Sequence, residues 1–232
     1  MVKKTKEEWK IYKNVFDRFT VKTIFKLITQ GYFEGLTSPY KIGKESNIYL
    51  AKKQKEKVIV KIYRLESCNF NKMYDYIKTD PRYMKLKKQR RKVIFSWVQR
   101  EYRNLLKARE KINVPTPHAF SNNIIVMEMI GKYEPAPQLK DVIPENIEEF
   151  FEKTVGSVKK LLELGLVHGD LSEFNILNYM DLPFFIDFSQ TTEKKDPRAK
   201  ELLERDCKNL ARFFKKSGIK TKKEEILKKI LE

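Results

Sequence analysis

Apolar residues recur at helical spacing in several parts of the chain. The clearest pattern runs over about residues 93–109, where bulky apolar residues fall at i, i+3, i+4, i+8 and i+11. That spacing predicts one long amphipathic helix whose apolar stripe faces a core. Similar stripes predict two short helices within residues 5–30 followed by Gly31 as a C-cap, a helix over 144–164, a helix that opens at 196–199, and a short basic helix over 221–232.

Alternating and continuous apolar runs predict strands before and after the long helix. Residues 36–63 indicate three strands, with Gly43 at the first bend. Within residues 58–63, side chains alternate between two faces, as is typical of a strand. Val58, Val60 and Ile62 point to one face, and Lys61 points to the other. The apolar run over 124–130 predicts a buried strand.

One stretch, residues 66–92, shows neither pattern. It is rich in polar residues and ends in the mostly basic run over 85–92, which reads KLKKQRRK. We interpret it as a long, flexible insertion. Its basic end is either a solvated charge run or a contact for RNA phosphates, and the sequence leaves both open.

The candidate chemistry lies in residues 168–190, HGDLSEFNILNYMDLPFFIDFSQ. Asp170 and Asn175 are five residues apart, and Asp187 follows at the end of an apolar run. This order is that of the kinase catalytic loop and its metal-binding strand: a base, an Asn for a second metal, and an Asp for Mg²⁺. Mg²⁺ takes hard oxygen ligands, and a nearby carboxylate can accept the proton of an attacking hydroxyl. An isolated HGD is usually a turn, but a turn does not explain the linked spacing.

Three further residues support this interpretation. Lys61 lies in mid-strand after a glycine turn, as the phosphate-binding lysine of kinases does. Glu101 lies on the apolar face of the long helix, and a buried carboxylate needs a partner. We therefore expect an ion pair with Lys61; the alternative is that Glu101 extends from the stripe to solvent. Asp206 is also an acid on an apolar stripe, and we expect it to accept hydrogen bonds from the catalytic-loop backbone.

These elements predict an α+β, two-lobed, protein-kinase-like fold. A small β-rich N-lobe with one long helix should join a reduced, mainly helical C-lobe near residues 128–131. Backbone groups of Glu128 and Ile130 should meet the adenine edge, with Met127 behind it. The expected domains are an N-terminal helical extension over 1–35, the N-lobe with its insertion over 36–130, and the C-lobe over 131–232.

The composition adds a large positive charge. The 232 residues include 49 Lys and Arg against 31 Asp and Glu, a formal net charge of +18. Such a surplus favours a polyanionic partner, with RNA the first candidate, although a Lys-rich solvated surface has the same composition. Cys68 and Cys207 lack metal-ligand spacing, which indicates a reducing compartment and no zinc site. With no apolar run of membrane-spanning length and no signal-like start, we expect a cytoplasmic protein without membrane contact.

Several linked motifs together resemble the RIO family of atypical serine/threonine protein kinases. HGDLSEFNIL with FIDFSQ carries the resemblance, and the DFSQ ending favours the type-1 branch. Two departures from the pattern, Gly169 and the pair Lys41–Ile42, affect fine nucleotide contacts rather than the reaction class. Further matching segments follow in order over nearly the whole chain, at residues 43–49, 61–64, 97–105, 127–131 and 203–210.

The resemblance implies ATP binding with Mg²⁺ or Mn²⁺, phosphorylation of serine, and a role in late maturation of the small ribosomal subunit. Asp170 and Asp187 would be catalytic, and Asn175 and Asp187 would bind the metal. Phosphorylation of Asp187 itself would make the protein an ATPase switch. Expected partners are the small-subunit precursor and its RNA, with an unknown protein substrate or autophosphorylation. The residues expected to contact the nucleotide are Lys41, Ile42, Gly43, Lys44, Glu45, Ser46, Asn47, Lys61, Glu101, Met127, Glu128 and Ile130.

Other function classes compete with this one. A small kinase of the tRNA threonylcarbamoyladenosine machinery shares the HGDL loop and the length, but not SEFN, SQ or the long separation of Lys61 from Glu101. An aminoglycoside- or choline-type kinase would need a larger C-terminal lobe. A conventional peptide kinase is disfavoured because few residues follow Asp187 and no APE signature occurs. An RNA-binding pseudokinase would not need Lys61, Asp170, Asn175 and Asp187 intact.

Overall fold

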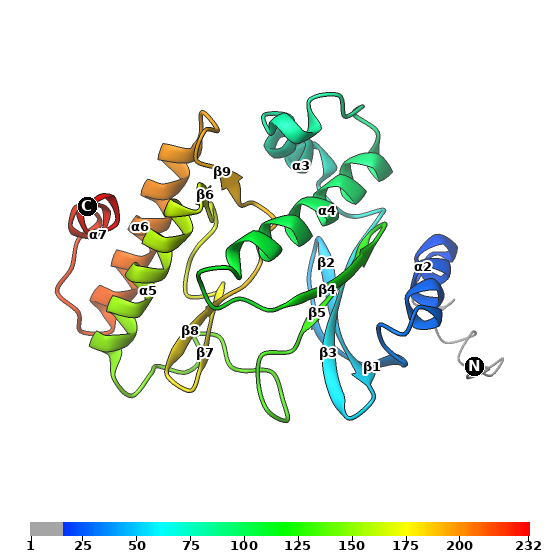
Figure 1. The fold of residues 1–232 in the computed structure, drawn as a ribbon, viewed down its shortest axis with the longest axis horizontal. Coiled ribbons are helices and arrows are strands. Elements are labelled where there is room, and N and C mark those ends of the chain that lie inside the picture. Colours follow the sequence, from blue (N-terminus) through cyan, green and yellow to red (C-terminus); the bar gives the residue numbers. More distant parts are fainter. Residues whose placement is uncertain (1–15) are drawn as a thin grey trace. The chain divides into compact units, whose positions relative to one another are not determined.

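The computed structural model describes residues 16–232 and consists of two compact units (Figure 1). The first of the two helices predicted within residues 5–30 lies outside the described residues. Within the described range, no helix has the combination of length and apolar character that a membrane span requires. Unit 1 comprises the chain up to Met73 with Lys87–Gln99 and Pro117–Glu128, and unit 2 comprises Tyr74–Leu86, Arg100–Thr116 and Met129–Glu232.

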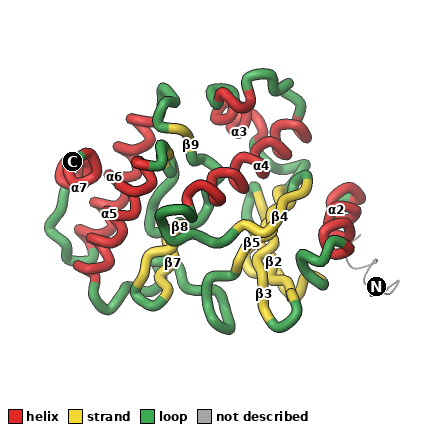
Figure 2. The backbone as a smooth tube through the Cα atoms, in the orientation of Figure 1, coloured by secondary structure: helices red, strands yellow, loops and turns green. Residues whose placement is uncertain are grey.

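Unit 1 is built on a five-stranded antiparallel sheet in the order β1-β2-β3-β5-β4 (Figure 2). The three strands predicted over 36–63 and the strand predicted from residue 124 are confirmed. β4 was not predicted, because prolines disfavour a strand; it lies at the sheet edge, where a proline is tolerated. The bounds are β1 (Gly35–Ile42), β2 (Ser46–Lys53), β3 (Glu56–Tyr63), β4 (Pro117–Ser121) and β5 (Ile124–Glu128).

The core of unit 1 lies between this sheet and α2 (Arg18–Thr29). Val58, Val60 and Ile62 of β3 face that core, so the predicted alternation is confirmed. Asp17 caps the first turn of α2 by accepting from two backbone N–H groups. Gly31 follows the helix with φ +79°, as predicted for the C-cap region, and it allows Tyr32 N–H to reach the carbonyl of Leu27 at 3.1 Å.

The predicted insertion over 66–92 contains helices that the sequence pattern did not reveal. These are α3 (Phe70–Ile77) and the 3₁₀ turn η1 (Pro81–Tyr83), and α4 (Arg90–Ala108) already begins within the basic run. α3 is short, and its buried side chains, Met73 and Ile77, give one i, i+4 pair, too little to mark a periodicity. The long helix predicted near 93–109 is confirmed as α4.

Unit 2 is mainly helical. α5 (Ile147–Glu163), α6 (Ala199–Lys216) and α7 (Lys223–Leu231) confirm the three predicted C-terminal helices, and α7 packs on both others. In α6 the buried positions keep helical spacing to the last turn, where the buried aromatic residue is Phe214. Two small antiparallel pairs complete the unit: β6 (Leu166–Val167) with β9 (Thr192–Glu193), and β7 (Ile176–Tyr179) with β8 (Leu182–Phe185).

A glycine is required where β5 has ended and the chain turns. Gly131 has φ +138°, and a Cβ there would lie 2.1 Å from the carbonyl oxygen of Glu134. The turn is closed by Ala136 N–H, which donates to the carbonyl of Ile130 at 2.7 Å. No L-residue fits this position without displacing the backbone.

We expect Gly131→Ala to lower the free energy of unfolding by at least about 1–3 kcal/mol, because of backbone strain and the clash. Gly156→Ala is the matched control. Gly156 lies within α5, where a Cβ meets no heavy atom within 4 Å, so alanine should stabilise by about 0.5–1 kcal/mol. Denaturant unfolding of both variants measures the difference, and equal shifts would contradict it.

Candidate functional site

The loop that carries Asp170 is held by the carboxylate of Asp206. Asp206 is buried in α6; its Oδ2 accepts from Gly169 N–H at 2.7 Å and its Oδ1 from Leu171 N–H at 2.8 Å. Both N–H groups flank Asp170, so the carboxylate fixes the backbone on either side of it. The scaffold role predicted for Asp206 is therefore confirmed.

The neighbours of Asp206 on α6 complete this support. Arg205 donates to the carbonyl of Gly169, and Asn209 Nδ2 donates to that of Leu171 at 3.1 Å. Burial raises the pKa of Asp206 to about 7, while the two backbone N–H groups that it accepts from act in the opposite direction. Gly169 has φ +78°, and a Cβ would lie 3.1 Å from the carbonyl oxygen of Gln190. This turn therefore depends on glycine as well as on α6.

The predicted base and the predicted second metal ligand are adjacent. Asn175 Nδ2 donates to the carbonyl of Asp170 at 2.8 Å and lies 3.4 Å from Asp170 Oδ2. Because the NH₂ group serves Asp170, the side-chain oxygen is the group that Asn175 has for a metal. The backbone carbonyl of Asn175 accepts from Ile186 N–H at 3.0 Å, next to Asp187. Asn175 thus contacts Asp170 and the residue that precedes Asp187.

Asp187 occupies a strained backbone conformation. Its φ is +61°, in the left-handed region that residues other than glycine rarely adopt. Ser189 Oγ donates to Asp187 Oδ1 at 2.7 Å. Strain of this kind persists where the surroundings over-determine the backbone, and such residues concentrate at functional sites.

His168 is a buried support of the same loop, a role that the sequence did not indicate. Its Nε2 lies 3.0 Å from the carbonyl oxygen of Ile186, and its Nδ1 lies 3.3 Å from Asp170 N–H. The ring packs against Phe185 and Phe188. Asp170 N–H needs an acceptor at Nδ1, so the neutral tautomer with hydrogen on Nε2 fits both contacts. Burial lowers the pKa of His168 to about 4.

The predicted phosphate loop lies in unit 1 between β1 and β2. Gly43 N–H donates to the carbonyl of Ser46 at 3.0 Å, and a Cβ on Gly43 would lie 2.8 Å from that oxygen. The side-chain oxygen of Asn47 is buried without a hydrogen-bond partner. A tight glycine turn and an unsatisfied buried oxygen fit a polar ligand such as a nucleotide. The side chains of Lys41, Ile42 and Lys44 are exposed, and those of Glu45 and Ser46 are half-buried.

The other predicted nucleotide-binding residues belong to both units. Lys61 is buried in unit 1 with its Nζ 5.1 Å from the centre of the Tyr63 ring, and Glu101 is buried in unit 2. Their ion pair stays a prediction. Met127 is buried and Glu128 half-buried at the end of β5. The carbonyl of Ile130 already accepts a hydrogen bond from Ala136 N–H, so the predicted adenine contact of Ile130 would use its N–H group.

The donor set fits Mg²⁺ that is bound together with nucleotide. In residues 16–232 no group of three or more His, Cys, Asp or Glu side chains is arranged to hold a metal ion. Mg²⁺ usually takes one or two carboxylates and completes its shell with phosphates and water. Asp187 with the side-chain oxygen of Asn175 fits that need.

Comparisons with known proteins identify the family of the chain. The RIO domain model matches residues 47–227. The chain is 40% identical over 226 residues to the RIO-type serine/threonine-protein kinase Rio1 of Methanocaldococcus jannaschii, which covers 97% of this chain and 78% of that protein. It is 36% identical to the Rio1 kinase of Haloferax volcanii over 93% of this chain and 75% of that one.

A solved structure shares the fold. It is the Rio2 kinase–ADP/Mg²⁺–phosphoaspartate complex from Chaetomium thermophilum, with a TM-score of 0.69 and 20% identity. The match covers 90% of this chain and 66% of that one. The predicted α+β, kinase-like fold class is therefore confirmed.

We expect the contribution of His168 to stability to fall as the pH drops from about 6.5 to about 4, because the unfolded chain protonates His168 in that range and the folded chain does not. The raised pKa of Asp206 acts in the opposite direction over this range, so the test compares variants that all keep Asp206. The lowered pKa corresponds to a loss of up to about 3 kcal/mol at the acid end. His168→Gln removes this titration, so the unfolding free energy of the variant should rise relative to that of the original protein as the pH drops through this range. His118→Gln, at the other histidine of the chain, is the control and should keep the slope of the original protein. Parallel curves for all three proteins would contradict the assignment.

Proposed function

The chain belongs to the RIO family of atypical serine/threonine kinases, and on that premise we propose that it is an ATP-dependent kinase and ATPase that acts in maturation of the small ribosomal subunit. The observation that carries the catalytic part is that Asn175 contacts both Asp170 and Ile186, the residue before Asp187, in a loop that Asp206 fixes. The ribosomal part is supported by the family resemblance and by the basic surface described below.

The two aspartates have separate roles in this proposal. Asp170 accepts the proton of the attacking hydroxyl, and Asn175 keeps its side chain in place through Nδ2. Asp187 and the side-chain oxygen of Asn175 hold the metal ions. When bound, Mg²⁺ neutralises charge on the transferred phosphoryl group.

Asp187 is also the proposed phosphoryl acceptor. Asp187 would hold the metal that binds the transferred phosphoryl group, and carboxylates form acyl phosphates in some ATPases. One oxygen of Asp187 would bond to the γ-phosphorus as the bond to ADP breaks, and water would then release phosphate. The Rio2 structure of similar fold is a complex with phosphoaspartate, which supports this chemistry here.

Protein incubated with γ-labelled ATP should carry label that hydroxylamine removes, because hydroxylamine cleaves acyl phosphates and leaves phosphoserine intact. Asp187→Asn should carry none of this label. Asp170→Asn, which keeps the metal-binding side chain, is the comparison for effects of the base alone. Hydroxylamine-resistant label on a serine would leave Asp187 as a metal ligand only.

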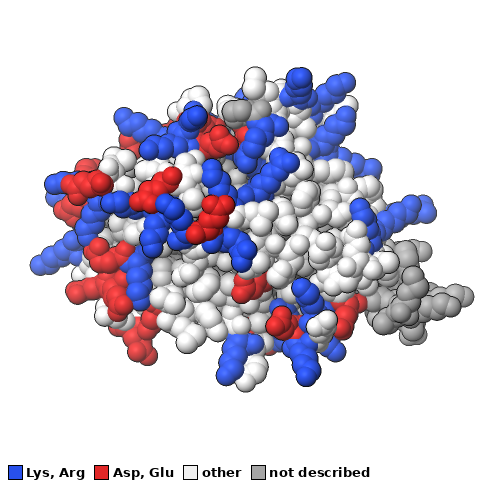
Figure 3. Space-filling model, viewed as in Figure 1, with Lys and Arg blue, Asp and Glu red and all other residues white. Residues whose placement is uncertain are grey.

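The proposed RNA contact is the basic run over 85–92. Its Lys and Arg side chains are exposed. The turn before α4 lies in the upper right of Figure 1, and in the same region of Figure 3 the basic side chains, drawn in blue, have few acidic neighbours. Two of these arginines also have structural contacts. Arg90 donates to the carbonyls of Leu65, Glu66 and Cys68, and Arg91 lies over the Phe19 ring. A test of RNA binding should therefore leave both arginines in place.

We expect the triple variant of Lys85, Lys87 and Lys92 to Gln to bind small-subunit precursor RNA more weakly. Each lost phosphate contact should reduce the slope of log affinity against log salt by about 0.7 to 0.9, so the slope of the triple variant should be smaller by about 2 to 3. The matched control changes Lys215, Lys216 and Lys220, exposed residues at the end of α6, to Gln. Filter binding over a salt series measures both proteins, and equal affinities and slopes would reduce the run to a solvated surface.

A further inference from the structure

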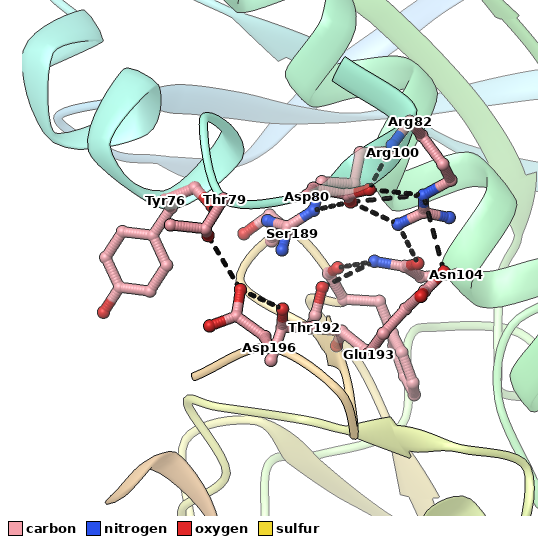
Figure 4. A network of polar contacts seen from close by, with 12 residues as sticks. Tyr76, Thr79, Asp80, Arg82, Arg100, Asn104, Ser189, Thr192, Glu193 and Asp196 are labelled. Carbon is pink, nitrogen blue, oxygen red and sulfur yellow. Dashed lines mark hydrogen bonds and ion pairs between the residues drawn. The ribbon is translucent and has the colours of Figure 1, made fainter. Parts of the chain in front are cut away.

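A buried polar cluster in unit 2 connects the segment 66–92 to the helix α4 (Figure 4). We call Asp80, Arg82, Arg100 and Asn104 the Asp80 cluster. The side chain of Arg100 is 0% exposed and that of Asp80 1%. Asp80 Oδ2 lies 3.2 Å from Arg100 Nε and 2.6 Å from Arg82 Nη2, and Arg82 Nη2 also lies 3.4 Å from Asn104 Oδ1. The cluster therefore holds Arg100 and Asn104 in one arrangement.

The cluster ends on the backbone that follows Asp187. Arg100 Nη1 donates to the carbonyl of Ser189 at 3.1 Å. Asn104 Nδ2 donates to the carbonyls of Phe188 at 3.2 Å and Thr191 at 2.9 Å. Two side chains on neighbouring turns of α4 thus fix three carbonyls within four consecutive residues.

Ser189 connects this backbone to the Asp187 carboxylate. Its carbonyl accepts from Arg100, and its hydroxyl donates to Asp187 Oδ1 at 2.7 Å. Asp187 itself has the left-handed φ of +61°. A strained residue keeps its conformation only when its neighbours hold it there, and Phe188 and Ser189 are the neighbours that α4 holds.

The far end of the same segment is fixed by a second buried acid. Asp196 accepts from Thr192 Oγ1 at 2.9 Å, from Thr79 Oγ1 at 2.7 Å and from Arg198. Thr79 precedes Asp80, so adjacent residues reach both ends of the segment from 188 to 196: Thr79 contacts Asp196 directly, and Asp80 reaches Ser189 through Arg100. Buried ionic groups are a weak source of net stability, but the hydrogen bonds that they make select one geometry. Here the selected geometry is the path of the chain after Asp187.

We propose that Asn104 and Arg100 are positioning residues for Asp187, acting through Ser189 and the backbone of residues 188–191. The inference rests on the proposed metal and phosphoryl roles of Asp187. Loss of the Asn104 or Ser189 contacts frees the carboxylate to turn away from the metal, and a displacement of about 1 Å at a reacting group can lower the rate about a hundredfold. Nucleotide binding in unit 1 does not involve these contacts.

The test is the Mg²⁺ dependence of ATP turnover by Asn104→Ala. The Mg²⁺ concentration for half-maximal turnover should rise about tenfold and kcat should fall ten- to hundredfold, while the KM for ATP at saturating Mg²⁺ changes less than about twofold. Asn178→Ala is the matched control, because Asn178 is a buried asparagine of unit 2 that donates to the carbonyl of Val142, away from this segment. It should lose stability without a change in Mg²⁺ dependence.

A second variant protects the test against misfolding. Ser189→Ala removes the hydroxyl on Asp187 Oδ1 but leaves the Asp80 cluster and every buried charge in place. Ser189→Ala should reproduce the rise in the Mg²⁺ concentration that half-maximal turnover requires. Ser189→Thr keeps a hydroxyl and should bring that concentration most of the way back to the value of the original protein. Mn²⁺ binding to the protein–ADP complex, followed by electron paramagnetic resonance, should weaken in Ser189→Ala in parallel with turnover.

The outcomes separate this inference from the proposed function. If Asp187→Asn keeps full turnover and Mn²⁺ affinity, the proposed role of Asp187 falls. If Asp187→Asn loses both while Asn104→Ala and Ser189→Ala behave like Asn178→Ala, the role of Asp187 stands and the positioning inference is overturned. Loss of Mg²⁺ affinity in all three site variants, with Asn178→Ala unaffected, supports both.

Discussion

The candidate site depends first on the buried carboxylate of Asp206. A buried carboxylate needs hydrogen-bond donors, and for Asp206 these donors are the backbone N–H groups of Gly169 and Leu171. Backbone donors cannot move without moving the chain. The same contact that satisfies the carboxylate therefore fixes the position of Asp170, and α6 becomes the rigid base of the catalytic loop.

The remaining buried polar groups of unit 2 act on backbone in the same way. The loops around Asp170 and Asp187 have little regular secondary structure, so their N–H and carbonyl groups need partners from side chains. The side chain of His168 contacts the carbonyl of Ile186, that of Asn175 donates to the carbonyl of Asp170, and Arg100 and Asn104 donate to further carbonyls from α4. The polar groups are concentrated around the two aspartates because irregular backbone there must be both satisfied and immobile. These contacts explain how Asp187 keeps its left-handed backbone conformation, with φ +61°.

The sequence was sufficient wherever the information was local. Periodicity located α4, α5 and α6 because one buried stripe per helix repeats every three or four residues. The alternation in β3 predicted which face meets the core, and the spacing of Asp170, Asn175 and Asp187 predicted the chemistry. Glu101 and Asp206 were identified as buried acids because each interrupts an apolar stripe, and for Asp206 even the class of partner was predicted correctly.

Only the tertiary structure decided the rest, and the reason is sequence distance. Arg100 and Asn104 bond to carbonyls 84 to 89 residues away, and such contacts leave no period or motif in the chain. The short α3 and the edge strand β4 form because neighbours cover or pair with them, although their own residues give weak or contrary signals. The sequence thus predicted which residues carry the chemistry, whereas the packing of distant segments decided which backbone groups hold those residues in place.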